Sequence, residues 1–308
     1  MKAALLANRG VVKVAGEGAR TFLHGLITAD MLKLTPGQAR FCALLTPQGK
    51  IIADFFVVEA PAADGGGFFL DVPRALIATL VERLNLYKLR AKVLIEDLSG
   101  VLGVVAAWNG DAVGASGTGK RGPSLAFGDP RLSTLGLRIL IPPHRAADAA
   151  MELGATLAAA SDYDAHRIAL GVPQGDSDFK YGDAFPHETD MDQLGGVDFD
   201  KGCYVGQEVV SRMEHRGTAR TRAVPVRYDD AAPLAGTAIT AADKPVGTMG
   251  SAANGRGVAL IRLDRAAEAL ADGSALSAAG VPVRLVKPDW AHFAFPGESA
   301  AGAAKAAG

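Results

Sequence analysis

The sequence predicts an α+β protein in which two antiparallel α/β subdomains are followed by a small β-barrel. Helical and strand periodicities alternate up to Gly217, and five short strand-like runs separated by Gly, Pro and Asp turns follow it. The end of the chain is rich in Gly, Ala, Ser and Lys and has little to bury. The expected organisation is a region 1–217 of two subdomains that need not be continuous, a β-barrel 218–295 and a disordered tail 296–308.

Most elements of the first region follow from periodicity. Residues 74–86 carry apolar side chains at helical spacing directly after Pro73, which predicts a helix. Residues 40–46 and 50–59 read as strands joined by the turn at 47–49. The other expected strands are 11–14, 68–72, 92–96, 101–107, 138–141 and 197–199, the other expected helices are 18–26, 145–159, 162–170 and one from Gln207, and 110–123 is an expected loop. The expected barrel strands are 222–228, 235–240, 246–251, 256–262 and 281–286.

Composition excludes several classes of protein. The 308 residues are 49% hydrophobic and 21% charged, with a formal net charge of -1, so no global charge favours nucleic acid, and no direct nucleic-acid partner is expected. The two cysteines, Cys42 and Cys203, form neither a disulfide framework nor a zinc-type pair. A reducing compartment is therefore the default.

Location and metal binding are also constrained. No apolar run reaches about 18 residues, so no membrane span is expected. Residues 8–10 interrupt the first apolar run too early for a signal peptide, and we expect a cytoplasmic protein.

The six histidines show no zinc spacing with one another. The polar segment 187–192 could suggest a metal, but loop polarity explains it equally well, so no metal site is expected.

The segment 200–208 carries the strongest chemical signal. Cys203 follows Gly202 and lies beside Lys201, and a helix with Glu208 in its first turn is expected from Gln207. A lysine and a helix N-terminus both stabilise a thiolate, so Cys203 and Lys201 are the candidate catalytic residues. The alternative is that Cys203 fills a small apolar hole and that the glycines only shape a turn.

The run Lys-Gly-Cys-Tyr-Val-Gly-Gln-Glu at 201–208 resembles the signature of the YgfZ family, a folate-binding branch of the glycine-cleavage T-protein superfamily. Segments 22–30, 43–51, 167–173 and 245–248 are similar to other parts of that superfamily and occur in its order. The resemblance covers nearly the whole chain. It implies a cloverleaf whose central hole holds tetrahydrofolate or a one-carbon derivative, and it makes region 1–217 the folate-binding part. The motif residues it marks are Gly202, Tyr204, Gly206, Gln207 and Glu208.

The chemistry of folate selects further candidates. The pterin edge suits a carboxylate and the glutamate tail suits arginine. Asp54 interrupts a hydrophobic strand, and it keeps the second member of an Asp pair that T-proteins carry in this segment. The alternative for Asp54 is a strand residue bonded to backbone. Arg216 and Arg220 connect the cysteine helix to the barrel and are the candidates for the tail, with a solvated basic face as the alternative.

The resemblance also bears on the reaction. T-proteins carry Arg-x-Glu-x-Gly, and here the glutamate position is Ala169, so whether the protein is an enzyme stays open. The resemblance implies a folate-binding accessory protein for iron–sulfur cluster assembly or repair, which supports tRNA modification indirectly and has iron–sulfur enzymes or assembly proteins as partners. Two alternatives are a folate-dependent aminomethyl- or methyltransferase and a non-catalytic folate-binding module. Cys203 could act as a nucleophile, a transient ligand or a redox sensor.

Overall fold

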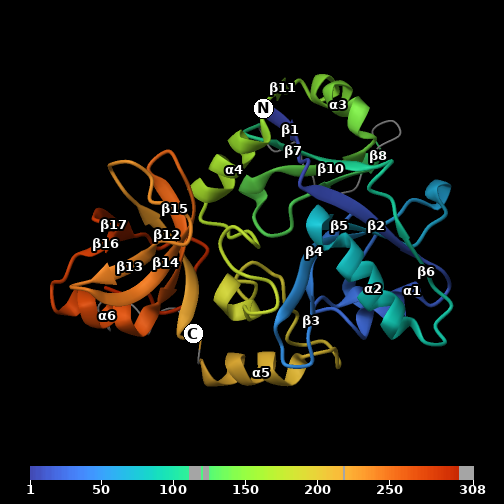
Figure 1. Ribbon diagram of the computed structural model, residues 1–308. Coiled ribbons are helices and arrows are strands. Elements are labelled where there is room, and N and C mark those ends of the chain that lie inside the picture. The colour runs from blue at the N-terminus through green and yellow to red at the C-terminus, as the bar shows by residue number, and fades with distance from the viewer. Residues whose placement is uncertain (111–118, 121–124, 218, 298–308) are drawn as a thin grey trace. The chain divides into compact units, whose positions relative to one another are not determined.

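The computed structural model describes residues 1–110, 119–120, 125–217 and 219–297 (Figure 1). The chain divides into two compact units. The first unit contains Met1–Tyr163 and Leu194–Val209, and the second contains Asp164–Gln193 and Val210–Gly308. The expected boundary at residue 217 stays a prediction, and most of the expected tail, residues 298–308, lies outside the described residues.

The first unit contains an antiparallel five-stranded sheet in the order β3-β4-β5-β2-β6. The expected hairpin is confirmed, because β3 and β4 pair with Phe41 opposite Phe56. The expected helix over 74–86 is also confirmed, and its Leu80 and Leu84 are fully buried against the sheet. The bounds are β2 Arg9–Ala15, β3 Ala39–Leu45, β4 Ile51–Glu59, β5 Phe68–Pro73, β6 Leu94–Asp97, α1 Ala19–His24 and α2 Ile77–Lys88.

A second sheet of the first unit has the order β11-β1-β7-β10-β9-β8. The strand at Lys2–Leu5 was not expected, and it pairs antiparallel with β7 and parallel with β11. The expected helix over 145–159 is wrong in its second half, because Gly154 adopts a φ of 63° and the chain then enters β11. The bounds are β1 Lys2–Leu5, β7 Gly103–Trp108, β8 Gly119–Lys120, β9 Leu125–Gly128, β10 Leu137–Ile141, α3 Ala146–Glu152 and β11 Thr156–Leu157.

Two further expectations for this unit concern a loop at 110–123 and a strand at 197–199. Within the expected loop 110–123, residues 119–120 form β8, while 111–118 and 121–123 lie outside the described residues. The expected strand at 197–199 is wrong. The N–H of Asp198 instead donates to the carbonyl of Thr28 at 3.0 Å, so this segment is tied to the turn after α1 without entering a sheet.

Buried ion pairs connect the two sheets of the first unit. Arg138 on β10 donates to Asp71 on β5 at 2.6 Å and to Asp129 at 3.0 Å, and its guanidinium lies 4.0 Å from the ring centroid of Phe56. Burial alone would raise the pKa of Asp129, but Arg131 and Arg138 outweigh it and lower that pKa to about 2. Each buried carboxylate therefore has a cationic partner, which buried charges require.

The second unit contains a closed barrel in the order β12-β15-β14-β13-β16-β17 (Figure 1). The expected barrel is confirmed, since all five expected runs contribute a strand. The short strand β16 and the helix α6 were not expected. Closure pairs every strand on both sides, so the barrel exposes no free strand edge. The bounds are β12 Thr221–Arg227, β13 Ala238–Ala241, β14 Lys244–Ala253, β15 Arg256–Arg262, α6 Leu263–Ala271, β16 Leu276–Ala278 and β17 Val281–Leu285.

Two helices lie where the chain passes between the units in sequence, α4 Ala160–Ala169 and α5 Gln207–Arg216. The remaining elements are one-turn helices: η1 Met31–Lys33, η2 Ala62–Asp64, η3 Arg74–Leu76, η4 Ser133–Leu135, η5 Pro143–Arg145 and η6 Pro186–Thr189. Two mixed α/β layers with mainly antiparallel sheets and a closed barrel confirm the predicted α+β class. Of the helices in the described ranges, none combines the length and apolar character that crossing a bilayer requires.

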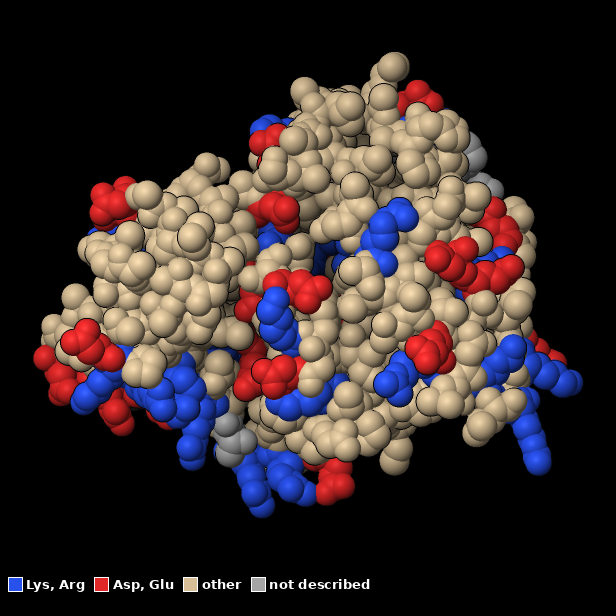
Figure 2. Space-filling view, in the orientation of Figure 1, with Lys and Arg blue, Asp and Glu red and all other residues tan. Residues whose placement is uncertain are grey.

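Charged side chains of both signs are spread over the visible face of the molecule. Figure 2 shows acidic and basic groups intermixed on each unit, with basic side chains over α5. This distribution agrees with a formal net charge of -1. The expected absence of a direct nucleic-acid partner stays a prediction.

Candidate functional site

The cysteine loop belongs to the first unit and presents its thiol to solvent. Cys203 is exposed, whereas Cys42 is fully buried. On either side of the exposed pair Gly202–Cys203, the side chains of Lys201 and Tyr204 are buried. The loop is thus held by its two flanking side chains, and the thiol lies between them on the surface.

Lys201 attaches the cysteine loop to the end of α1 and the turn that follows it. Its Nζ donates to the carbonyl oxygens of His24, Ile27 and Ala29 at 2.7, 2.6 and 2.9 Å, and it lies 4.9 Å from the ring centroid of Tyr204. Burial lowers the pKa of this ammonium to about 8. The ammonium donates to three carbonyl groups. That it also stabilises a Cys203 thiolate stays a prediction.

The helix expected from Gln207 is present as α5. Residues 204–206 separate it from Cys203, so the thiol lies before the helix rather than in its first turn. The effect of a helix dipole falls off within that turn. The expected dipole contribution to a Cys203 thiolate therefore stays a prediction.

Gly206 seats the loop on the hairpin between β3 and β4. Its φ is 84°, and an added Cβ would lie 2.5 Å from the carbonyl oxygen of Thr46 and 3.1 Å from the Cα of Gly49. Gly49 is itself at a φ of 82° and packs against Val209. The motif therefore needs glycine at position 206 for both backbone angle and space.

Replacing Gly206 by Ala is expected to lower the free energy of unfolding by about 2 to 4 kcal/mol, because it adds left-handed strain and a backbone clash. Gly202→Ala is the matched control, since its Cβ would meet only Nε2 of His24 at 4.0 Å. We expect that control to change stability by about 0.5 kcal/mol or less. Urea denaturation measures both, and equal effects would contradict this account of the motif.

The turn after α1 contacts the cysteine loop and the segment before it. Thr28 donates from Oγ1 to the carbonyl of Gly196 at 2.6 Å and accepts from the N–H of Ala43 at 2.8 Å. Nδ1 of His24 lies 3.1 Å from Oδ1 of Asp30. His24 and Asp30 were not expected at the site, although both lie in the segment 22–30 that carries part of the family resemblance.

Asp54 lies on β4 opposite Ala43 and is 9% exposed. Its neighbour Phe55 points into the core of the unit, so Asp54 points to the other face of the sheet. Burial raises the pKa of the Cys42 thiol well above its usual range, with Lys201 opposing and Asp54 adding to the shift. The S–H of Cys42 donates to the carbonyl of Phe55 at 3.4 Å. Folate binding by Asp54 stays a prediction.

The two arginines selected for the folate tail belong to the second unit. Arg216 ends α5, Arg220 precedes β12, and both are exposed. Their exposure is compatible with ligand binding and with a solvated face, so their role stays a prediction. Arg222, two residues later, is buried and has a different environment.

Arg222 is the centre of an ion-pair network in the second unit. Its guanidinium donates to both carboxylate oxygens of Asp192 at 2.9 and 2.8 Å, to Oδ1 of Asp190 at 3.0 Å and to the carbonyl of His187 at 2.9 Å. Burial raises the pKa of Asp190 well above its usual range, with Arg222 opposing and Asp192 adding to the shift. Arg222 is therefore the main charge partner of this acidic segment.

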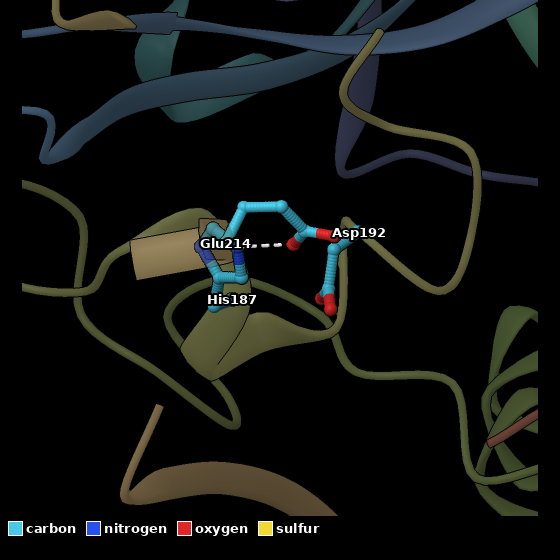
Figure 3. Close-up of side chains that lie close together, drawn as sticks. All are labelled: His187, Asp192 and Glu214. Atoms are coloured by element: carbon cyan, nitrogen blue, oxygen red, sulfur yellow. Dashed lines mark hydrogen bonds and ion pairs between the residues drawn. The ribbon is translucent and has the colours of Figure 1, made fainter. Parts of the chain in front are cut away.

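His187, Asp192 and Glu214 bring their donor atoms within 4.8 Å of one another (Figure 3). Figure 3 shows the Glu214 carboxylate directed at the imidazole, and Nε2 of His187 lies 3.0 Å from its Oε2. These are metal-ligand types, but both oxygens of Asp192 already accept from a guanidinium whose positive charge opposes a dication. We interpret the cluster as an ion-pair network, and the expected absence of a metal site stays a prediction.

Comparisons with known proteins identify relatives of this chain. A family model described as the CAF17 C-terminal beta-barrel domain matches residues 220–293. The mitochondrial iron–sulfur cluster assembly factor IBA57 of Homo sapiens is 30% identical over 302 residues, which is 92% of this chain and 84% of the human protein. The mitochondrial IBA57 homologue of Mycosarcoma maydis is 34% identical over 239 residues, 74% of this chain.

The fungal relatives are longer than this chain, and a solved structure shares its fold. The match covers only 57% of the Mycosarcoma maydis protein, so the chain spans little more than half the length of such fungal relatives. The crystal structure of glycine cleavage system aminomethyltransferase T from Bartonella henselae superposes with a TM-score of 0.73 over 96% of this chain and 87% of that chain. At 14% identity, that likeness shows the fold alone.

Proposed function

Because the chain belongs to the YgfZ/IBA57 family, we propose that it acts in iron–sulfur cluster assembly. The printed names of its relatives, which are mitochondrial iron–sulfur cluster assembly factors, support this proposal. The observation that carries it is the exposed Cys203 on an anchored loop, since the other cysteine is buried. Iron–sulfur enzymes or assembly proteins would be the partners.

The thiol is the working group in this proposal. Lys201, Tyr204 and Gly206 pack the loop against the rest of the first unit, while Gly202 and Cys203 are exposed to a partner. An exposed thiol on an anchored loop is suited to sulfur chemistry with a second protein. An effect on tRNA modification would be relayed through an iron–sulfur enzyme that this protein supports. The cytoplasmic location remains part of the proposal.

Folate binding is a second part of the proposal. The T-protein fold supports it, and Asp54, Arg216 and Arg220 are the residues proposed to contact tetrahydrofolate or a one-carbon derivative. Aminomethyl transfer is the weaker alternative, because the side chain at position 169 is a methyl group with no acid to serve a pterin. The backbone carbonyl of Ala169 accepts a hydrogen bond from Arg256 at 3.0 Å.

The test is rescue of cells that lack this protein. The readout is the activity of an iron–sulfur enzyme that methylthiolates tRNA, with the wild type, Cys203→Ala and Cys42→Ala expressed at matched levels. We expect the wild type and Cys42→Ala to restore activity and Cys203→Ala to fail. Equal rescue by Cys203→Ala would refute the thiol-dependent role, and no rescue by the wild type would refute the assembly function.

A further inference from the structure

The imidazole of His24 lies beside the backbone that carries Cys203. A Cβ built on Gly202 would lie 4.0 Å from Nε2 of His24. The carbonyl group of the same His24 accepts from Lys201 at 2.7 Å, so both its backbone and its side chain adjoin the loop. Its side chain is 19% exposed and thus partly shielded from water.

Asp30 lies on the far side of the ring. Its Oδ1 lies 3.1 Å from Nδ1 of His24 and also accepts from the N–H of Leu32 at 2.8 Å. The residue is 8% exposed, so the carboxylate is largely shielded from water. A carboxylate beside Nδ1 favours the tautomer with its proton on that nitrogen. The lone pair then resides on Nε2, the atom beside Gly202.

The other charged groups around this pair are Lys33, Asp198, Asp200 and Lys201. The ammonium of Lys33 lies 2.9 Å from Asp198 and 3.8 Å from Asp30. Burial alone would raise the pKa of Asp30, but the Leu32 N–H and the charges of His24, Lys33 and Lys201 outweigh it and lower that pKa. Asp30 is therefore a carboxylate at neutral pH and can stabilise an imidazolium.

We propose that His24, oriented by Asp30, accepts the proton of the Cys203 thiol and thereby makes Cys203 reactive at neutral pH. The S–H bond breaks, its electron pair stays on sulfur, and the proton passes to Nε2 directly or through one water molecule. The products are a thiolate and an imidazolium paired with Asp30. This is the arrangement of nucleophile, base and orienting carboxylate that activates thiols in general. The inference deepens the proposed function, since it rests on Cys203 being the working thiol.

The test is the rate at which iodoacetamide alkylates the purified full chain between pH 5 and 10, followed by intact-mass spectrometry. Only Cys203 is exposed, and Cys203→Ser confirms that the added mass is on that residue. We expect His24→Gln to raise the midpoint of the pH profile by about one unit and to slow alkylation at pH 7 by about tenfold. Asp30→Asn should shift the midpoint in the same direction by a smaller amount.

The matched control is His215→Gln, which changes an exposed histidine in the last turn of α5 and should leave the profile unchanged. Identical midpoints for the wild type and His24→Gln would overturn the inference. A second measurement needs no His24 variant. At pH 7 the NMR signals of the His24 imidazole should lie closer to those of an imidazolium in the wild type than in Cys203→Ser, and identical signals would also overturn the inference.

The two proposals fail separately. An unchanged alkylation profile in His24→Gln, together with failed rescue by Cys203→Ala, would remove the role of His24 and keep the assembly function. A shifted profile with full rescue by Cys203→Ala would remove the thiol-dependent function and keep the proton transfer.

Discussion

Replacing Arg222 by Met is expected to lower the free energy of unfolding of the second unit by about 3 to 5 kcal/mol, because it removes the cation that pairs with Asp192 and the donor from which Asp190 accepts. Asp190 is fully buried, and Asp192 accepts from the guanidinium with both oxygens. The carbonyl group of His187 would lose its donor as well. Chemical denaturation followed by circular dichroism measures the loss.

Arg227→Met on the same strand is the matched control, since Arg227 is exposed and its removal should cost less than about 1 kcal/mol. The triple variant Arg222→Met, Asp190→Asn, Asp192→Asn should recover part of the loss, because the uncompensated charges are gone. A loss no larger for Arg222→Met than for Arg227→Met would show that the network does not stabilise this unit.

Replacing Lys201 by Met is expected to cost the first unit about 2 to 4 kcal/mol. Methionine has nearly the same length but no donor for the three carbonyl groups that Lys201 satisfies. The loop should also loosen, so proteolytic cleavage near Cys203 should become faster. Thermal denaturation and limited proteolysis are the measurements.

Lys33→Met provides the comparison for Lys201. Lys33 is about half exposed and makes a surface pair with Asp198, so its replacement should cost much less stability than the replacement of Lys201. If both lysine variants lost the same stability and kept the same cleavage rate, the anchoring role assigned to Lys201 would be wrong.

Local signals in the sequence were sufficient for much of the fold. The helical spacing that includes Leu80 and Leu84 identified α2, and the turn around Gly49 identified the β3–β4 hairpin. The five barrel strands followed from turn residues. The strand at Lys2–Leu5 was missed because it has only four residues and its apolar positions do not alternate with polar ones. Its pairing with β7 and β11 makes it a strand.

The site was predicted less completely, for a physical reason. Cys203 and its glycines form a local pattern, and the sequence identified them. The anchors of Lys201 lie 172 to 177 positions away in the chain, and no local pattern carries such a contact. The same holds for His24, which gains its place beside Gly202 only through folding. The pairing of Arg222 with Asp190 and Asp192 is also a contact across about 30 positions of the chain, which no local pattern carries.

The pairing of β1 has a consequence for the way the chain is made. At a synthesis rate of about 5 to 20 residues per second, this strand leaves the ribosome about 5 to 20 seconds before β7, which begins at Gly103, can reach it. The first unit also needs Leu194–Val209, which is translated after Asp164–Gln193 of the second unit. The nascent protein therefore cannot complete its units one after the other. Its cysteine loop can join the first unit only after part of the second unit has been translated.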